Sequence, residues 1–145
     1  MKTENMLPDK DLKIKETLRV RFNETDPLGI VWHGHYITYF EEGREAFGRK
    51  WGLSYLDVQK QGFATPIVKS MCEHFLPLKY GDTFTIETTF IPSDSAKLIF
   101  RYRLFNEAEQ LVCSGETVQV FLDSDGNLSF YNPPFFQEWK NTMGL

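Results

Sequence analysis

One segment of this 145-residue chain has a helical period, and the segments around it alternate like strands. Between His35 and Gly52 large apolar side chains recur at helical spacing, at Tyr36, Tyr39, Phe40, Phe47 and Trp51. Charged side chains separate them, so the segment predicts an amphipathic helix with one buried face. Gly52 can end that helix in the left-handed conformation.

Two glycines lie inside the predicted helix, at positions 43 and 48. Each is expected to cost about 1 kcal/mol relative to alanine. A helix tolerates such residues more readily where another part of the backbone passes close to it. Gly43 and Gly48 therefore predict that a sheet wraps tightly around this helix.

The segment from Ile14 to Phe22 alternates between apolar and polar side chains, which predicts a strand with one buried face. The apolar side is formed by Ile14, Leu18, Val20 and Phe22, with Glu16 as the exception. Asn23 to Gly34 contains Asn, Asp-Pro and two glycines, which are typical of a loop.

The rest of the chain is mainly strand-like, with strands expected near residues 63–76, 84–90, 98–104 and 111–122. In the last of these the alternation slips at Gly115, which indicates a bulge or bend. Residues 54–61 are expected to form a turn region, and residues 135–143 a short amphipathic end. The connectors Gly81-Asp82, Pro92-Ser93-Asp94 and Asn106-Glu107 suit hairpin turns, so the sheet should be largely antiparallel.

This order of elements, one strand, one helix and four strands, predicts an α+β fold in which the helix covers one face of the sheet. A curved antiparallel sheet wrapped around one long central helix is the hotdog fold. We expect a flexible N-terminal tail over residues 1–12 and a single hotdog domain over residues 13–145.

Composition and charge limit the classes of partner that we expect for the chain. The net charge of −4 does not favour a nucleic-acid partner, which would require a basic surface. No apolar run approaches the roughly 20 residues of a membrane span. The N-terminus has no apolar signal core, so we expect a cytoplasmic protein. Cys72 and Cys113 are expected to be reduced core residues.

The loop before the helix reads Thr25-Asp26-Pro27-Leu28-Gly29-Ile30-Val31-Trp32-His33-Gly34-His35-Tyr36, and Tyr39-Phe40-Glu41 and Arg44 continue it. This run resembles the signature of the 4-hydroxybenzoyl-CoA thioesterase family and of the Tol-Pal-associated acyl-CoA thioesterases. Pro77-Leu78-Lys79-Tyr80-Gly81-Asp82 resembles the family's Pro-x-x-x-Gly-Asp turn. The chain departs from the family at His35, where asparagine is usual.

The resemblance implies hydrolysis of an acyl-CoA thioester, with Asp26 as nucleophile or as general base towards water. The backbone N–H of His33, seven residues later at the helix start, would donate to the oxyanion. The His33 imidazole could also orient Asp26 or water. Trp32, Gly34 and Tyr36 are the expected substrate-binding residues. The acyl group, and whether coenzyme A or acyl carrier protein carries it, stay open.

No cofactor or metal is expected. His33, His35 and His74 offer three imidazoles, but residues two apart on a helix point to different faces. The resemblance also implies a homodimer or homotetramer, in which the Asp26 loop is completed by partner residues near positions 68–71.

Two other functions stay in view, a hotdog hydratase or dehydratase and a non-catalytic acyl-binding module. Hotdog hydratases are similar in fold but have an Asp-x-Asn-Pro-x-His run, which this loop lacks. Some hotdog thioesterases use a glutamate of the helix, which would here be Glu41, Glu42 or Glu45. Lys79, Arg101 and Arg103 are candidates to meet the phosphates of coenzyme A.

Overall fold

The computed structural model describes residues 12–145. The expected tail therefore lies outside the described residues except for Leu12, which is buried. The elements are β2 (Lys13–Arg19), η1 (Phe22–Glu24), α2 (His35–Trp51), α3 (Tyr55–Lys60), β3 (Ile67–His74), β4 (Thr83–Ile91), β5 (Lys97–Asn106), β6 (Leu111–Val120) and α4 (Pro134–Met143). None of the helices in this described part is long and apolar enough to cross a membrane.

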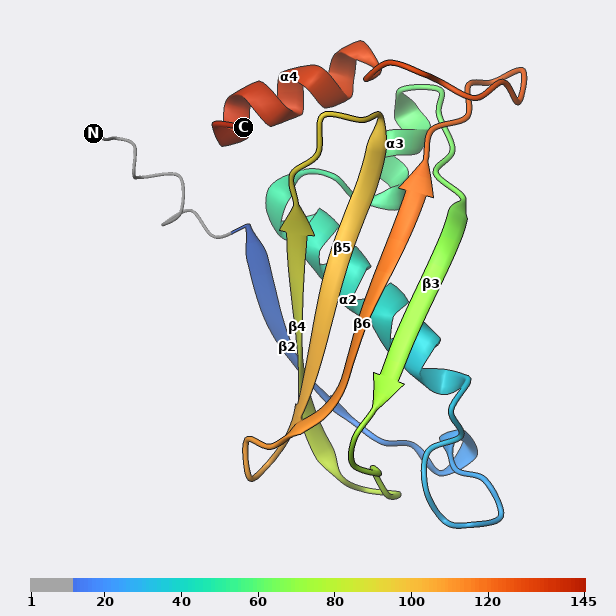
Figure 1. The fold of residues 1–145 in the computed structure, drawn as a ribbon, viewed down its shortest axis with the longest axis vertical. Helices are drawn as coiled ribbons and strands as arrows, with labels where there is room; N and C mark the ends of the chain where they lie inside the picture. The colour runs from blue at the N-terminus through green and yellow to red at the C-terminus, as the bar shows by residue number, and fades with distance from the viewer. Residues whose placement is uncertain (1–11) are drawn as a thin grey trace.

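The five strands form one antiparallel sheet in the order β2-β4-β5-β6-β3, and α2 lies along one face of it (Figure 1). This arrangement confirms the predicted α+β fold with a central helix. The helix ends as expected, because Gly52 caps it with a φ of 80°. The final helix α4 crosses one end of the sheet in Figure 1.

The core lies between α2 and the inner face of the sheet. Phe40 of the helix stacks on Tyr102 of β5, with ring centroids 4.3 Å apart. Opposite Tyr102 in the register stands Gly115, where a Cβ atom would overlap the Phe40 ring. The glycine is therefore required by ring packing. Of the expected bulge or bend at Gly115, the bulge is absent, since the β5–β6 register shifts at Phe105, which pairs with Leu111.

The two helix glycines have different neighbours. A Cβ atom at Gly43 would overlap Thr88 Oγ1 of β4, so the sheet does approach the helix closely there. At Gly48 the Cβ atom would lie 2.6 Å from Ser54 Cα, in the chain that leaves the helix. The prediction of a close sheet is thus confirmed for Gly43 and wrong for Gly48, which makes room for the turn after α2.

Three local predictions are also wrong. Residues 54–61 form helix α3 rather than a turn, because Ser54 and Asp57 cap it reciprocally through N–H to side-chain bonds of 3.1 and 2.9 Å. Phe22 is 75% exposed, because the strand ends at Arg19 and η1 turns the chain. Gly81-Asp82 does not close a hairpin, because β3 and β4 are not neighbours in the sheet.

The segment between β3 and β4 instead crosses the end of the molecule at which α2 begins. There Val31 donates a backbone hydrogen bond of 2.8 Å to Leu78. This crossing brings residues 78–82 beside the loop that contains Asp26.

Candidate active site

The Asp26 loop, the blue loop at the lower end of Figure 1, lies below the start of α2 and forms two strands of a small ribbon. Asp26 donates its backbone N–H to Ile30 at 2.8 Å, and Trp32 donates to Glu24 at 2.9 Å. Residues 78–79 add the third strand, because Ile30 is bridged to Lys79. We call residues 24–26, 30–32 and 78–79 the Asp26 ribbon.

The two faces of the Asp26 ribbon differ in burial. Directly paired residues of antiparallel strands share a face, and successive residues alternate between faces. Val31 and Leu78 are 3% and 0% exposed, so their face packs into the core. Asp26, Ile30 and Lys79 are therefore aligned on the opposite face, where Lys79 is exposed and Asp26 and Ile30 are half-buried.

The turn at the tip of the ribbon fixes the Asp26 carboxylate. Leu28 donates its backbone N–H to Asp26 Oδ1 at 2.8 Å, and Gly29 takes a left-handed φ of 81° that closes the turn. Asp26 Oδ2 accepts no hydrogen bond from any described residue. A carboxylate with one oxygen held and one free can attack a carbonyl carbon or accept a proton from water.

The start of α2 offers backbone donors. Gly34 stands at the N-cap and has no side chain to cap the helix. Within residues 12–145, the backbone N–H groups of His33 and Gly34 donate to no protein acceptor. Both N–H groups lie at the positive end of the helix dipole, where a developing negative charge is stabilised.

Trp32 covers this helix start from one side. Its ring lies so close to Gly34 that a Cβ atom there would overlap it. The ring also contacts the imidazoles of His33 and His35, with centroids 5.0 and 5.5 Å away. Because Trp32 is still 47% exposed, a bound group could pack against its free surface.

Asp26 lies within the Asp26 ribbon, and His33 follows directly after the ribbon's middle strand. Asp26 pairs with Ile30, and His33 follows three residues later, which is about 10 Å of extended chain. The turn closed by the His35 N–H on the Trp32 carbonyl, at 2.9 Å, then directs the chain into the helix start.

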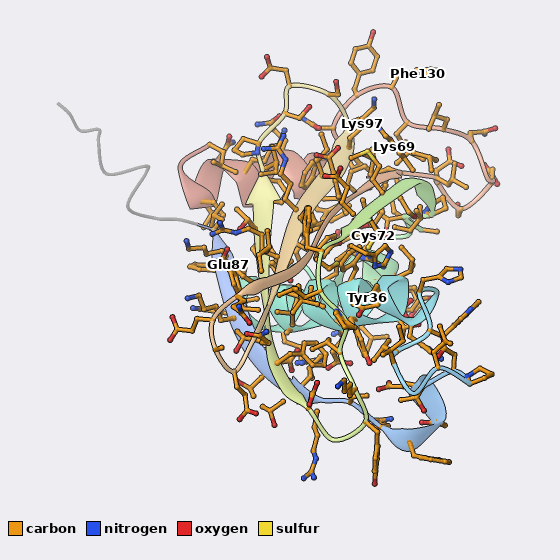
Figure 2. All side chains as sticks on the ribbon, turned by 60° about the horizontal axis from the view of Figure 1, so that its bottom comes forward. Tyr36, Lys69, Cys72, Glu87, Lys97 and Phe130 are labelled. Carbon is orange, nitrogen blue, oxygen red and sulfur yellow. The ribbon has the colours of Figure 1, made fainter. Side chains whose placement is uncertain are left out.

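Tyr36 lies deeper than the other predicted binding residues. Only 3% of it is exposed, and its ring packs edge-on against His74 with centroids 4.8 Å apart. Burial raises the pKa of the Tyr36 hydroxyl to about 12, with a smaller contribution from Cys113. Figure 2 shows Tyr36 on α2 and Cys72 on the facing strand β3. Tyr36 therefore supports the helix start from within the core.

Glu24 and Tyr39 form a link that the sequence did not predict. Tyr39 donates its hydroxyl to Glu24 Oε1 at 2.8 Å, and Arg21 donates its backbone N–H to the same oxygen at 2.8 Å. Burial and this hydrogen bond raise the pKa of Tyr39 well above its usual range. A tyrosine on the buried face of the helix needs a partner for its hydroxyl, which is the one sequence signal for such a link.

The remaining candidates lie elsewhere. Glu41, Glu42 and Glu45 line a groove of about 560 Å³ between α2 and residues 65–67. Arg101 and Arg103 lie on the outer face of the sheet, paired with Glu116 at 3.0 Å and Glu87 at 2.8 Å.

The sulfur atoms of Cys72 and Cys113 lie 3.4 Å apart as free thiols. Among the described residues, no three His, Cys, Asp or Glu side chains gather closely enough to hold a metal ion.

Comparison with known proteins gives a consistent set of matches. The family model described as "Thioesterase-like superfamily" matches residues 20–140. The "Putative acyl-CoA thioesterase YneP" of Bacillus subtilis (strain 168) is 29% identical over 125 residues, which are 86% of this chain and 91% of that protein.

Two solved structures are also similar. The DHNA-CoA thioesterase of Staphylococcus aureus has a TM-score of 0.81 and 25% identity, and the match covers 92% of each chain. A mutant 4-hydroxybenzoyl CoA thioesterase complexed with 4-hydroxybenzoyl CoA has a TM-score of 0.75 and 26% identity, and covers 88% of this chain and 97% of its own.

Proposed function

The chain belongs to the thioesterase-like superfamily, and we propose that it hydrolyses acyl-CoA thioesters to a free acid and coenzyme A. The observation that carries the proposal is the half-buried Asp26 carboxylate, which has one oxygen without a hydrogen bond from the described residues and lies on a ribbon that leads to unpaired N–H groups at a helix start. The relative YneP, named as an acyl-CoA thioesterase, and the two similar thioesterase structures support the same reaction.

In the proposed mechanism the thioester carbonyl oxygen accepts hydrogen bonds from the backbone N–H groups of His33 and Gly34. Asp26 then acts by one of two routes. It attacks the carbonyl carbon to form an acyl–aspartate anhydride that water hydrolyses, or it takes a proton from water as water attacks. On either route the C–S bond breaks and coenzyme A leaves as the thiolate. One oxyanion donor is typically worth about 3–4 kcal/mol of barrier.

The other predicted residues have supporting roles in this proposal. Trp32 provides the apolar wall beside the N–H donors, and Gly34 makes room for its ring. Tyr36 positions the helix start from inside the core. The His33 imidazole, in contact with Trp32, is placed to orient water or Asp26.

A variant series tests the residue roles. Asp26→Asn should lower turnover by about 10²-fold or more, because an amide can neither attack nor accept the proton. Asp94→Asn, in an exposed turn, is the matched control. Release of free thiol from acyl-CoA is the assay, with circular dichroism to confirm folding. Turnover near the wild-type rate in Asp26→Asn would contradict the proposal and direct attention to Glu41, Glu42 and Glu45.

The backbone role of His33 has its own test. His33→Ala keeps the N–H and should cost less than Asp26→Asn. His33→Pro removes the N–H and should cost more than His33→Ala by about one oxyanion contact. Equal losses in two folded variants would show that the imidazole, not the backbone, does the work.

We also propose that a second copy of the chain completes the site at strand β3. Among the described strands β3 pairs only with β6, and every residue of β3 except Cys72 is exposed. Val68 and Met71 are 59% and 48% exposed on this open edge. Proteins normally cover such an edge, and joining two sheets does so. In Figure 1 the strand runs towards the Asp26 ribbon.

Sedimentation combined with activity on dilution tests this assembly, which could be a dimer or a dimer of dimers. Val68→Glu with Met71→Glu should lower both the sedimenting mass and the turnover. A monomer that keeps full turnover at nanomolar concentration would contradict a shared site.

A further inference from the structure

We propose that Phe22, Tyr80, Arg21 and Lys79 form a subsite for the nucleotide of coenzyme A, with the two rings against the adenine and the two cations against its phosphates. The proposal rests on the proposed function and extends it, because it makes coenzyme A rather than acyl carrier protein the carrier of the acyl group.

The two aromatic rings are exposed although they contact each other. Phe22 is 75% and Tyr80 63% exposed, and their centroids lie 5.6 Å apart at an interplanar angle of 85°. They contribute little to the core, so packing does not explain them. An exposed aromatic face binds a nucleobase by stacking, whatever the base.

Two cations precede the rings in the sequence and have no ion-pair partner among the described residues. Arg21 precedes Phe22, and Lys79 precedes Tyr80. Two acids within three residues of these cations in the sequence accept other hydrogen bonds: Glu24 accepts from Tyr39, and Asp82 accepts the Lys79 backbone N–H, both at 2.8 Å. In contrast, Arg101 and Arg103 on the outer face of the sheet are neutralised by glutamates.

The backbone holds the two halves of the subsite together. Val20 donates to Asp82 at 2.9 Å and Gly81 donates to Val20 at 3.2 Å, so the segments that carry Phe22 and Tyr80 are joined directly before the rings. The subsite is therefore part of the ordered fold and does not depend on a loose loop.

The distance between Lys79 and Asp26 suits the length of the pantetheine arm of coenzyme A. Asp26, Ile30 and Lys79 occupy three adjacent strands of the Asp26 ribbon, so Asp26 and Lys79 are about 10 Å apart at about 4.8 Å per strand. The pantetheine arm between sulfur and phosphate equals roughly four residues of extended chain, or about 14 Å. An acyl-CoA can thus place its thioester at Asp26 and its phosphates at Lys79, with the adenine beyond them at Tyr80.

The test compares one acyl group on three carriers: coenzyme A, pantetheine without the nucleotide, and acyl carrier protein. Tyr80→Leu and Lys79→Met should each raise KM for acyl-CoA on the order of 10-fold with little change in kcat, since one stacked base or one phosphate contact is lost. KM for acyl-pantetheine should not change. The control variants are Tyr131→Leu and Lys97→Met, exposed residues of the same types away from the Asp26 ribbon. Lys97, labelled in Figure 2, lies at the opposite end of β5.

An equal rise in KM for acyl-CoA and acyl-pantetheine, or no rise for either, would overturn the subsite. For Tyr80→Leu, an equal rise in KM for acyl-CoA and acyl carrier protein would also overturn the subsite, because only coenzyme A has an adenine. If the wild-type protein hydrolyses none of the three, the proposed function fails, and the subsite is then tested by calorimetry with adenosine 3′,5′-bisphosphate. The subsite is supported if the wild-type protein binds this compound and Tyr80→Leu weakens the binding. It is overturned if the wild-type protein does not bind the compound.

Discussion

Replacing Tyr39 by phenylalanine isolates the hydroxyl that joins helix α2 to the Asp26 ribbon. The ring of Tyr39 is buried against Phe84, with centroids 4.7 Å apart, and phenylalanine preserves this contact. What disappears is the 2.8 Å hydrogen bond to Glu24 Oε1. The backbone carbonyl of Glu24 also accepts a hydrogen bond from the backbone N–H of Trp32. Greater mobility of Glu24 is therefore expected to make the Asp26 ribbon before His33 more mobile.

The size of the effect follows from the burial of the pair. A hydrogen bond to a charged group contributes about 1.5–3 kcal/mol. Glu24 is only half-buried and keeps the bond from Arg21, so water can replace part of the loss. We therefore expect about 1–1.5 kcal/mol of lost stability, with a fall of about 2–6 °C in Tm at this chain length. Turnover should fall by less than about 10-fold, because Asp26 itself is untouched.

Urea unfolding and kcat should be measured for Tyr39→Phe, Glu24→Ala and the double variant. The double variant should lose less stability than the two single variants lose together, because each single change removes the same hydrogen bond. Tyr55→Phe, at an exposed position of α3, is the control. Fully additive losses, or a Tyr39→Phe variant indistinguishable from Tyr55→Phe, would refute the link.

Three further predictions concern packing and titration. Gly115→Ala should destabilise the fold by about 1–3 kcal/mol in urea unfolding, because the new Cβ atom meets the Phe40 ring. Gly34→Ala should displace Trp32 and lower kcat/KM, while Tm changes by no more than a few degrees. Between pH 10 and 12 the folded state holds the Tyr36 proton that the unfolded state has released. The contribution of this group to the free energy of unfolding is therefore fully present below pH 10 and falls by about 1.4 kcal/mol per pH unit between pH 10 and 12. Tyr36→Phe should flatten that slope, as measured by urea midpoints at each pH.

The elements of the fold were predictable because their patterns are local. Phe84, Ile86, Thr88 and Phe90 alternate along β4 and all four are buried, as a period of two requires. The order of strands was not predictable from the same evidence. Gly81-Asp82 has the residues of a hairpin turn, yet the chain there crosses from the sheet edge to β4. Contacts with residues distant in the sequence, such as the pairing of Val31 with Leu78, hold that path.

The candidate site likewise has one part that the sequence predicts and one part that it does not. Asp26 and the helix start at His33 follow from a continuous run of residues, whose spacing is visible in the sequence. The alignment of Lys79 with Asp26 and the bond from Tyr39 to Glu24 join segments that are distant in the sequence. Such contacts depend on how the sheet closes around the helix, and no local period encodes them.

Under the proposed function, the two faces of the Asp26 ribbon divide stability and chemistry between them. Val31 and Leu78 fix the ribbon by burying its inner face, and their backbone bond joins the strands. Asp26 and Lys79 lie one pleat away on the other face, which the proposed function assigns to the substrate. Since alternate residues of one strand are assigned to different faces, the chemistry can vary on the outer face while the inner face keeps the site in place.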